Sequence, residues 1–155
     1  MLQHLSIRNL ALIEAAELAF DPGLVTVTGE TGAGKSVLLG ALSLCAGNRA
    51  GKGVIRQGAE HCAVEAVLYF PDSARIDGVL AQYELPACEE GALVLRRELY
   101  AAKAGRVVIN GRAAPLATLR AIGEHWIDFH GPGEPQKLFH EGHQLSLLDL
   151  FAAHG

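Results

Sequence analysis

Alternation of hydrophobic and polar residues in the first 28 positions predicts three β-strands. The first two cover residues 2–7 and 14–20, and the Asp-Pro-Gly sequence at residues 21–23 is typical of a turn. The β-branched run at residues 24–28 lies between glycines and predicts a short third strand. We therefore expect the chain to open with a β-rich segment.

A helix is expected directly after this segment. From Gly34 the pattern becomes helical, residues 37–44 are apolar on nearly every side, and Gly47 is suited to end the helix. A helix that is apolar all round is expected to be buried.

Later elements show the same strand alternation and helical spacing. Strands are predicted at residues 63–70, 92–99 and 106–109, and the Asn110-Gly111 pair after the last one is a strong hairpin signal. Helical spacing returns at residues 116–125 and, beyond a loop around residues 131–135, at residues 144–153.

Composition narrows the class of protein. The 155 residues are 50% hydrophobic and 19% charged, with a net charge of -4, which indicates one folded domain rather than a disordered or fibrous chain. The longest uncharged apolar run, at residues 37–47, is about half of the ~20 residues that a membrane helix needs. We therefore expect a cytoplasmic protein whose three cysteines are reduced and mostly buried. The low charge also predicts that part of its surface is covered, either by another chain or by a continuation of this one.

Basic residues are concentrated between residues 96 and 120, where six basic groups face one acidic group. They are Arg96, Arg97, Lys103, Arg106, Arg112 and Arg120. Two interpretations stay open: a phosphate-facing patch that contacts DNA through Arg96, Arg97, Arg106 and Arg112, or a hairpin that displays arginines to solvent.

Residues 29–36 contain a complete G-x-x-x-x-G-K-[ST] phosphate loop between a predicted strand and a predicted helix. Glycines let backbone N–H groups turn toward a phosphate, and the helix N-terminus adds partial positive charge. We expect Lys35 to bridge the β- and γ-phosphates and Ser36 to hold Mg²⁺. The predicted ATP-binding residues are Gly29, Glu30, Thr31, Gly32, Ala33, Gly34, Lys35, Ser36 and Val37.

The second acidic element of a phosphate-loop enzyme has only one weak candidate, Asp128. Glu124 and His125 precede it where an apolar strand is needed, and no glutamate follows. The sequence therefore predicts a chain that binds ATP but does not complete the hydrolytic machinery alone. His140 and His143 have metal-ligand spacing without further ligands, which favours a surface loop, and Trp126 is expected to anchor a core or an interface.

Several segments, taken in order, resemble the RecN family of bacterial DNA double-strand-break repair ATPases, which are related to the structural-maintenance-of-chromosomes (SMC) proteins. Two strands precede the phosphate loop, as in ABC-type heads. Besides the phosphate loop, the matching segments are L-x-I-x-N-L-A-L-I at residues 5–13, L-C-A-G-N-R-A at 44–50, I-R-Q-G-A at 55–59, I-N-G-R at 109–112 and H-G at 130–131.

The resemblance implies an α/β phosphate-loop fold of ABC/SMC head type, with a mixed sheet, an antiparallel β subdomain and a buried phosphate-loop helix. Residues 1–155 would be the N-terminal half of the head, followed by a coiled coil and a C-terminal half that carries the signature motif and the Asp-Glu element. Two heads would sandwich ATP, and the complete head would be an ATPase. The implied partners are the C-terminal half, a second head and double-stranded DNA or its ends, in the cytoplasm at the nucleoid.

One position departs from the family pattern, and a second matches it but has two interpretations. Pro132 stands where the family has a glutamine that senses the metal and the γ-phosphate, and Gln136 is the nearest substitute for contacting nucleotide and Mg²⁺. Arg49 matches a region that in SMC-like heads supplies an arginine near the nucleotide and DNA, although a helix C-terminal arginine that complements the dipole is an equal interpretation.

The sequence thus favours an SMC-like ATPase that uses Mg-ATP in DNA repair and recombination by tethering DNA or its ends. Two alternatives stay open. One is a self-contained small-molecule kinase with Asp128 as its acidic element, and the other is an ATP-switched binding module without turnover.

Overall fold

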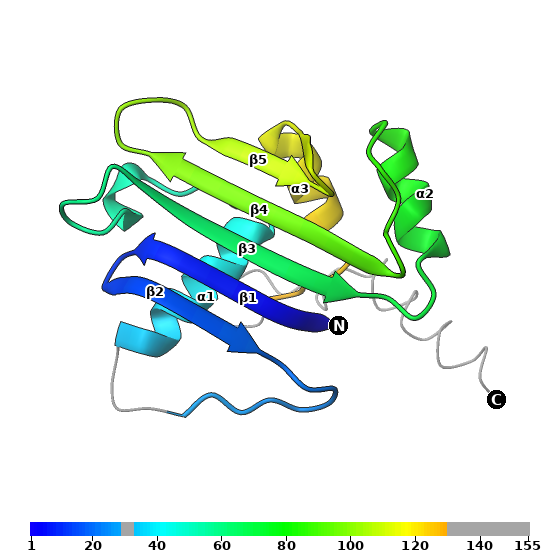
Figure 1. Ribbon diagram of the computed structural model, residues 1–155, viewed down its shortest axis with the longest axis horizontal. Helices are drawn as coiled ribbons and strands as arrows, with labels where there is room; N and C mark the ends of the chain where they lie inside the picture. The colour runs from blue at the N-terminus through cyan, green and yellow to red at the C-terminus, as the bar shows by residue number, and fades with distance from the viewer. Residues whose placement is uncertain (29–32, 130–155) are drawn as a thin grey trace, which may run out of the picture.

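The computed structural model describes residues 1–28 and 33–129, which are built on one six-stranded sheet (Figure 1). The strands are β1 Leu2–Leu10, β2 Ile13–Ala19, β3 His61–Tyr69, β4 Ala92–Tyr100, β5 Arg106–Ile109 and β6 Arg112–Ala113. Their order is β2-β1-β3-β4-β5-β6, and each neighbouring pair is antiparallel. The helices are α1 Ala33–Cys45, α2 Ala74–Gln82 and α3 Leu116–Gly123, with the 3₁₀ helix η1 at Lys52–Val54.

One face of the sheet carries the helices, and the opposite face is open (Figure 1). Alternate residues of each central strand are buried, because successive side chains of a strand point to opposite faces. Leu5 and Ile7 of β1 pack in the same core cluster as Ala41 and Leu44 of α1. A second cluster joins β4 and β5 to α2 and α3. An antiparallel sheet tolerates this arrangement because its polar face can meet water.

The hairpin predicted at Asn110-Gly111 is confirmed. Both residues have positive φ, 45° and 78°, as a two-residue hairpin turn of type I′ requires. The predicted end of α1 is confirmed too, since Gly47 follows the helix with a φ of 83°.

The strand predicted at residues 24–28 is wrong for the described part of the chain, because these residues join no strand there. Leu24 is 98% exposed and Val25 and Val27 are each 48% exposed. A strand is defined by its hydrogen-bonded neighbour, and no described segment occupies that position.

Helix α1 is buried on one face only. Ala41, Leu44 and Cys45 are buried, but Leu39 on the outer face is 57% exposed. The expectation of a helix buried all round therefore fails within the described residues. They also contain only antiparallel pairings, so the antiparallel part of the expected mixed sheet is what they show.

Helix α2 was not expected from the sequence. Ile76 and Leu80 face the core at helical spacing, and the Ser73 hydroxyl donates to Asp77 Oδ2 at 2.7 Å near the helix start. Gly78 inside the helix weakens its local signal. The loop at 131–135 and the helix at 144–153 lie outside the described residues, as do His140 and His143.

The three cysteines are free thiols, as expected: Cys45 and Cys62 are buried and Cys88 is partly buried. Burial raises the pKa of the Cys45 thiol to about 12, so it is an inert core residue. No helix in the described ranges has the length and apolar character needed to cross a membrane.

Candidate nucleotide-binding site

The first turn of α1 carries the described end of the phosphate loop. Gly34, Lys35 and Ser36 are exposed there, and this turn contains no acidic residue. The first N–H groups of a helix have no partner within it, so they and the helix dipole favour an anion. An ammonium group, a hydroxyl and the N–H groups of a helix N-terminus are together the donor types that bind phosphate. Of the predicted ATP-binding residues, Gly29, Glu30, Thr31 and Gly32 lie outside the described residues.

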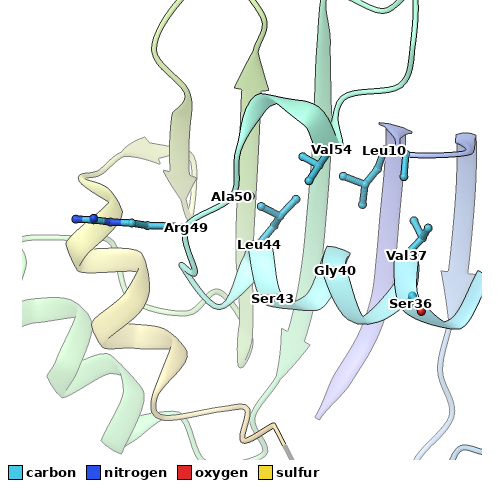
Figure 2. A pocket seen from close by; sticks show the side chains of 10 residues that line it. Leu10, Ser36, Val37, Gly40, Ser43, Leu44, Arg49, Ala50 and Val54 are labelled. Atoms are coloured by element: carbon cyan, nitrogen blue, oxygen red, sulfur yellow. The ribbon is translucent and has the colours of Figure 1, made fainter. Parts of the chain in front are cut away.

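A mostly apolar pocket of about 250 Å³ runs along α1 from Ser36 (Figure 2). Side chains of β1, α1 and the segment around η1 face one another across it. Its lining residues are Leu10, Ala11, Ser36, Val37, Gly40, Ser43, Leu44, Arg49, Ala50 and Val54. The pocket brings the predicted residues Ser36 and Val37 together with a wall that sequence analysis did not anticipate. Pockets of this kind, with few polar groups, typically hold the apolar part of a small ligand.

Arg49 lines one end of this pocket but extends away from its interior toward α3 in Figure 2. It is exposed and lies just beyond the α1 C-terminus. Neither interpretation of Arg49 is decided by this position. Gln136, the other predicted nucleotide contact, lies outside the described residues, together with Pro132 and the His130-Gly131 pair.

Asp128 is exposed and lies in an irregular stretch after α3, not at the end of a strand. The strand-borne carboxylate that holds a catalytic metal is therefore not formed by Asp128 here. Nor do the described ranges contain any group of three His, Cys, Asp or Glu residues able to hold a metal ion. Trp126 packs against both core clusters, which confirms its expected role as an anchor.

The basic residues between 96 and 120 do not form one surface. Arg96 and Arg97 are neighbours on β4 and point to opposite faces. Arg97 is 7% exposed and lies in the core near Cys45 and Cys62, where burial lowers the pKa of its guanidinium. Burial removes Arg97 from the set of exposed DNA contacts expected above.

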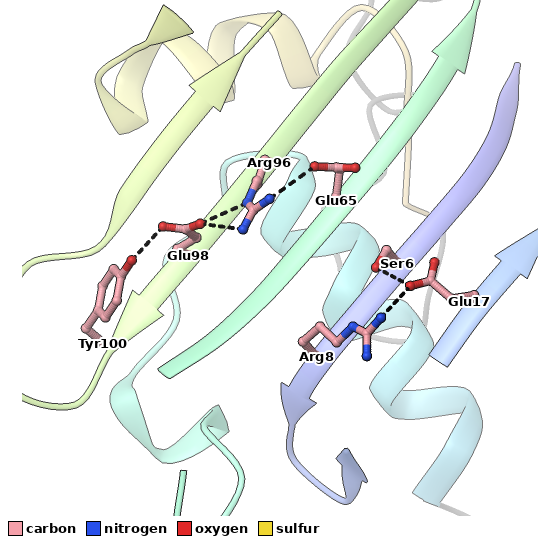
Figure 3. Close-up of polar contacts among 7 residues, drawn as sticks. All are labelled: Ser6, Arg8, Glu17, Glu65, Arg96, Glu98 and Tyr100. Carbon is pink, nitrogen blue, oxygen red and sulfur yellow. Dashed lines mark hydrogen bonds and ion pairs between the residues drawn. The ribbon is translucent and has the colours of Figure 1, made fainter. Parts of the chain in front are cut away.

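Arg96 lies on the open face within a network of ion pairs (Figure 3). Its guanidinium is 2.8 Å from Glu98 Oε1 and 3.6 Å from Glu65 Oε2. The Tyr100 hydroxyl donates to Glu98 Oε2 at 2.6 Å, and this bond and Arg96 lower the pKa of Glu98. A second pair on the same face joins Arg8 to Glu17 at 3.1 Å. Much of the positive charge here is therefore neutralised within the chain.

The Asn110-Gly111-Arg112 segment is hydrogen-bonded to β4 and to the loop that precedes it. The Asn110 amide donates to the carbonyls of Pro86 and Ala87 at 3.0 Å each, and its oxygen accepts from Val94 N–H at 2.9 Å. The Arg112 guanidinium donates to the Glu84 carbonyl. Arg106 is exposed, and Lys103 lies over the Tyr100 ring at 4.1 Å from its centroid.

Comparison with known proteins shows which proteins the chain is similar to. Residues 4–77 match the family model described as an AAA domain. The chain is 38% identical to the DNA repair protein RecN of Vibrio cholerae over 154 residues, which is 99% of this chain and 27% of that protein. It is 36% identical to the RecN of Bacillus subtilis over 152 residues, covering 98% of this chain and 26% of that protein. The chain thus spans about a quarter of the length of these curated relatives.

Among solved structures, the chain is similar to one from work on ATP-driven dimerization and DNA-stimulated activation of SMC ATPases. The TM-score is 0.64 at 18% identity, and the match covers 96% of this chain and 97% of that chain. The fold is thus that of an SMC-type head, as the antiparallel sheet and α1 also indicate. The resemblance noted in the sequence is confirmed: along nearly its whole length the chain is similar to DNA repair proteins of the RecN family, and its fold is that of an SMC-type head.

Proposed function

We propose that residues 1–155 are the N-terminal half of an ATPase head that binds Mg-ATP and, with a C-terminal half, hydrolyses it in DNA double-strand-break repair. The observation that carries the proposal is the start of α1. There Lys35 and Ser36 lie on the first turn of a helix that carries no acidic residue in this turn, and Ser36 lines an apolar pocket. The relatives of this chain are DNA repair proteins, which supports the biological setting.

The proposed nucleotide lies across two subsites. Its phosphates meet the first turn of α1, where Lys35 neutralises the β- and γ-phosphates and the Ser36 hydroxyl is a ligand for Mg²⁺. The base and ribose occupy the pocket between Val37 and the turn that joins β1 to β2. Bound Mg²⁺ would neutralise charge that develops on the phosphates.

A C-terminal half would complete the sheet beside residues 24–28. These residues combine high β propensity with exposure, and with side chains of α1 they border a groove of about 320 Å³. Val25 and Val27 line this groove together with Leu38, Leu39 and Leu42 of α1. The same half would supply the acidic element that Asp128 does not provide.

The remaining parts of the proposal concern partners. In the proposal, ATP joins two heads, and the joined heads tether double-stranded DNA or its ends at the nucleoid. The solved SMC structure similar to this chain comes from work on ATP-driven dimerization and DNA-stimulated activation, which supports joining by ATP and contact with DNA. Arg106 is the strongest candidate for DNA contact. All three arginines are exposed, but Arg96 forms ion pairs with Glu65 and Glu98 and Arg112 donates to a carbonyl, whereas Arg106 lies opposite Glu98 on the neighbouring strand.

The decisive experiment measures ATP turnover by this chain alone and mixed with the C-terminal half, with and without linear DNA. We expect no turnover by the chain alone, turnover after mixing, and loss of that turnover in Lys35→Ala. Turnover by the chain alone that depends on Lys35, or phosphate transfer to a small acceptor, would replace the proposal with a self-contained kinase.

DNA contact has its own test. If Arg106 contacts a phosphate, Arg106→Gln should reduce the slope of log affinity against log salt concentration by about 1. Arg97→Gln should leave the slope unchanged because Arg97 is buried. Equal slopes for wild type and Arg106→Gln would remove Arg106 from the DNA surface.

A further inference from the structure

The turn between β1 and β2 is joined to a segment more than 40 residues later in the chain. Backbone contacts place residues 54–56 beside residues 9–11 like a short extra strand. They are Ala11 N–H to Val54 O at 2.7 Å, Arg56 N–H to Asn9 O at 2.8 Å, and an antiparallel bridge between Leu10 and Ile55. This junction forms the wall of the pocket next to α1, since Leu10, Ala11 and Val54 all line it.

The side chain of Arg56 extends this junction across the tip of the turn. Its Nη1 donates to the Leu12 carbonyl at 2.9 Å, and its Nη2 lies 3.6 Å from Glu14 Oε2. The ion pair is weak because the Glu14 side chain is 78% exposed. The hydrogen bond from a charged donor is the stronger contact, and it fixes the carbonyl between the two strands.

The turn needs such a contact because its backbone is strained. Asn9 and Ala11 have φ values of 52° and 50°, in the left-handed region. Asparagine tolerates this region, but alanine is disfavoured there because its Cβ approaches the following carbonyl. A strained conformation persists only where its surroundings impose it, and such positions are common at binding sites.

We propose that Arg56 is a positioning residue for the nucleotide: it holds the β1–β2 turn in the conformation that forms the base-side wall of the pocket. Arg56 does not line the pocket, so it acts through Leu10 and Ala11. The inference rests on the proposed ATP site and assigns separate roles to two parts of it. The start of α1 binds the phosphates, and the clamped turn recognises the nucleoside.

The experiment compares binding of Mg-ATP and of Mg-tripolyphosphate, which lacks the nucleoside, by calorimetry. Arg56→Ala should bind Mg-ATP about 10-fold more weakly, the effect expected for losing one hydrogen bond from a charged group. Its affinity for tripolyphosphate should equal that of the wild-type chain. Lys35→Ala should lose both ligands, because Lys35 serves the phosphates.

Lys52→Ala is the matched control. Lys52 belongs to the same segment and donates from Nζ to the Ala101 carbonyl, but this contact lies away from the pocket. It should leave both affinities unchanged. An equal loss of ATP affinity in Lys52→Ala and Arg56→Ala would overturn the specific role of Arg56.

A double variant tests the strain argument. Glycine accepts the left-handed conformation without steric cost, so the turn should depend less on its clamp in Ala11→Gly. The loss of ATP affinity caused by Arg56→Ala should therefore be smaller in the Ala11→Gly background. An equal loss in both backgrounds would overturn the role assigned to turn strain.

The outcomes separate this inference from the proposed function. A folded wild-type chain that binds neither ligand would overturn the ATP site itself. Binding of ATP that depends on Lys35 but is unchanged in Arg56→Ala would overturn only the positioning role. Thermal unfolding checks that each variant is folded, and Arg56→Lys, which keeps the charge but loses the planar fork, replaces Arg56→Ala if the latter unfolds.

Discussion

Gly123, the last residue of α3, packs so closely against the end of α1 that an added methyl group has no room. A Cβ atom on Gly123 would lie 2.3 Å from the Ala46 carbonyl oxygen and 3.0 Å from its carbonyl carbon and Cα. Non-bonded heavy atoms prefer about 3.5–4.0 Å, so Gly123→Ala would force α1 and α3 apart by roughly 1 Å.

The size of the effect follows from two opposing contributions. Overpacking of this kind costs about 1–3 kcal/mol, and the cost should be high because the clashing atoms belong to the backbone. Alanine regains about 0.5–1 kcal/mol through the lower entropy of its unfolded chain. We therefore expect Gly123→Ala to lower the free energy of unfolding by about 1–2 kcal/mol.

Urea unfolding followed by circular dichroism measures this difference, and Gly78→Ala provides the matched control. Gly78 lies inside α2, and a Cβ atom there would meet nothing within 4 Å. Gly78→Ala should raise the free energy of unfolding by about 0.5–1 kcal/mol. If Gly123→Ala were stabilised as much as Gly78→Ala, the close contact between α1 and α3 would be wrong.

Three further predictions follow from other contacts. Arg97→Met should stabilise the chain by about 1–4 kcal/mol in urea unfolding, because none of the described carboxylates pairs with this buried guanidinium. A loss of stability would show that Arg97 has a partner. The folded state lowers the pKa of Glu98, so ionised Glu98 stabilises the fold at pH values above its ordinary pKa of 4.5. This contribution is lost as the pH falls through the lower folded pKa. Acid unfolding of Glu98→Gln should therefore depend less on pH than that of wild type, and equal dependence would remove Glu98 from this role. Backbone amides of residues 24–28 should exchange hydrogen rapidly in the chain alone and slowly with the C-terminal half; unchanged rates would contradict the proposed pairing.

Local sequence patterns predicted most strands correctly because each is buried on one face. Residues 64, 66 and 68 of β3 are buried and their neighbours are not, which is the alternation that a half-buried strand produces. The Asn-Gly turn was predictable for the same reason, since its φ values depend on two adjacent residues. α2 was missed because it is short and contains Gly78.

The candidate site was predictable only in part. The phosphate loop is one contiguous motif, so its described end at Lys35 and Ser36 followed from the sequence. The pocket beside it is assembled from β1, α1 and the segment around η1, and no single stretch of sequence shows that these approach one another. The burial of Arg97 was predictable from its position along the strand, although a count of charges does not show it. Arg97 has the same parity along β4 as the buried Leu95 and Leu99, which places it in the core.

Residues 24–28 show where the sequence of this chain stops determining its structure. Their valines and threonines favour an extended backbone, but β propensity largely measures packing against neighbouring strands. In the described part the run has no such neighbour, and its side chains and Leu39 of α1 remain exposed. These residues also connect the β1–β2 hairpin to the phosphate loop. Under the proposed function, pairing with the C-terminal half would therefore order the strand that leads into the ATP site, so that assembly of the head and nucleotide binding would favour each other.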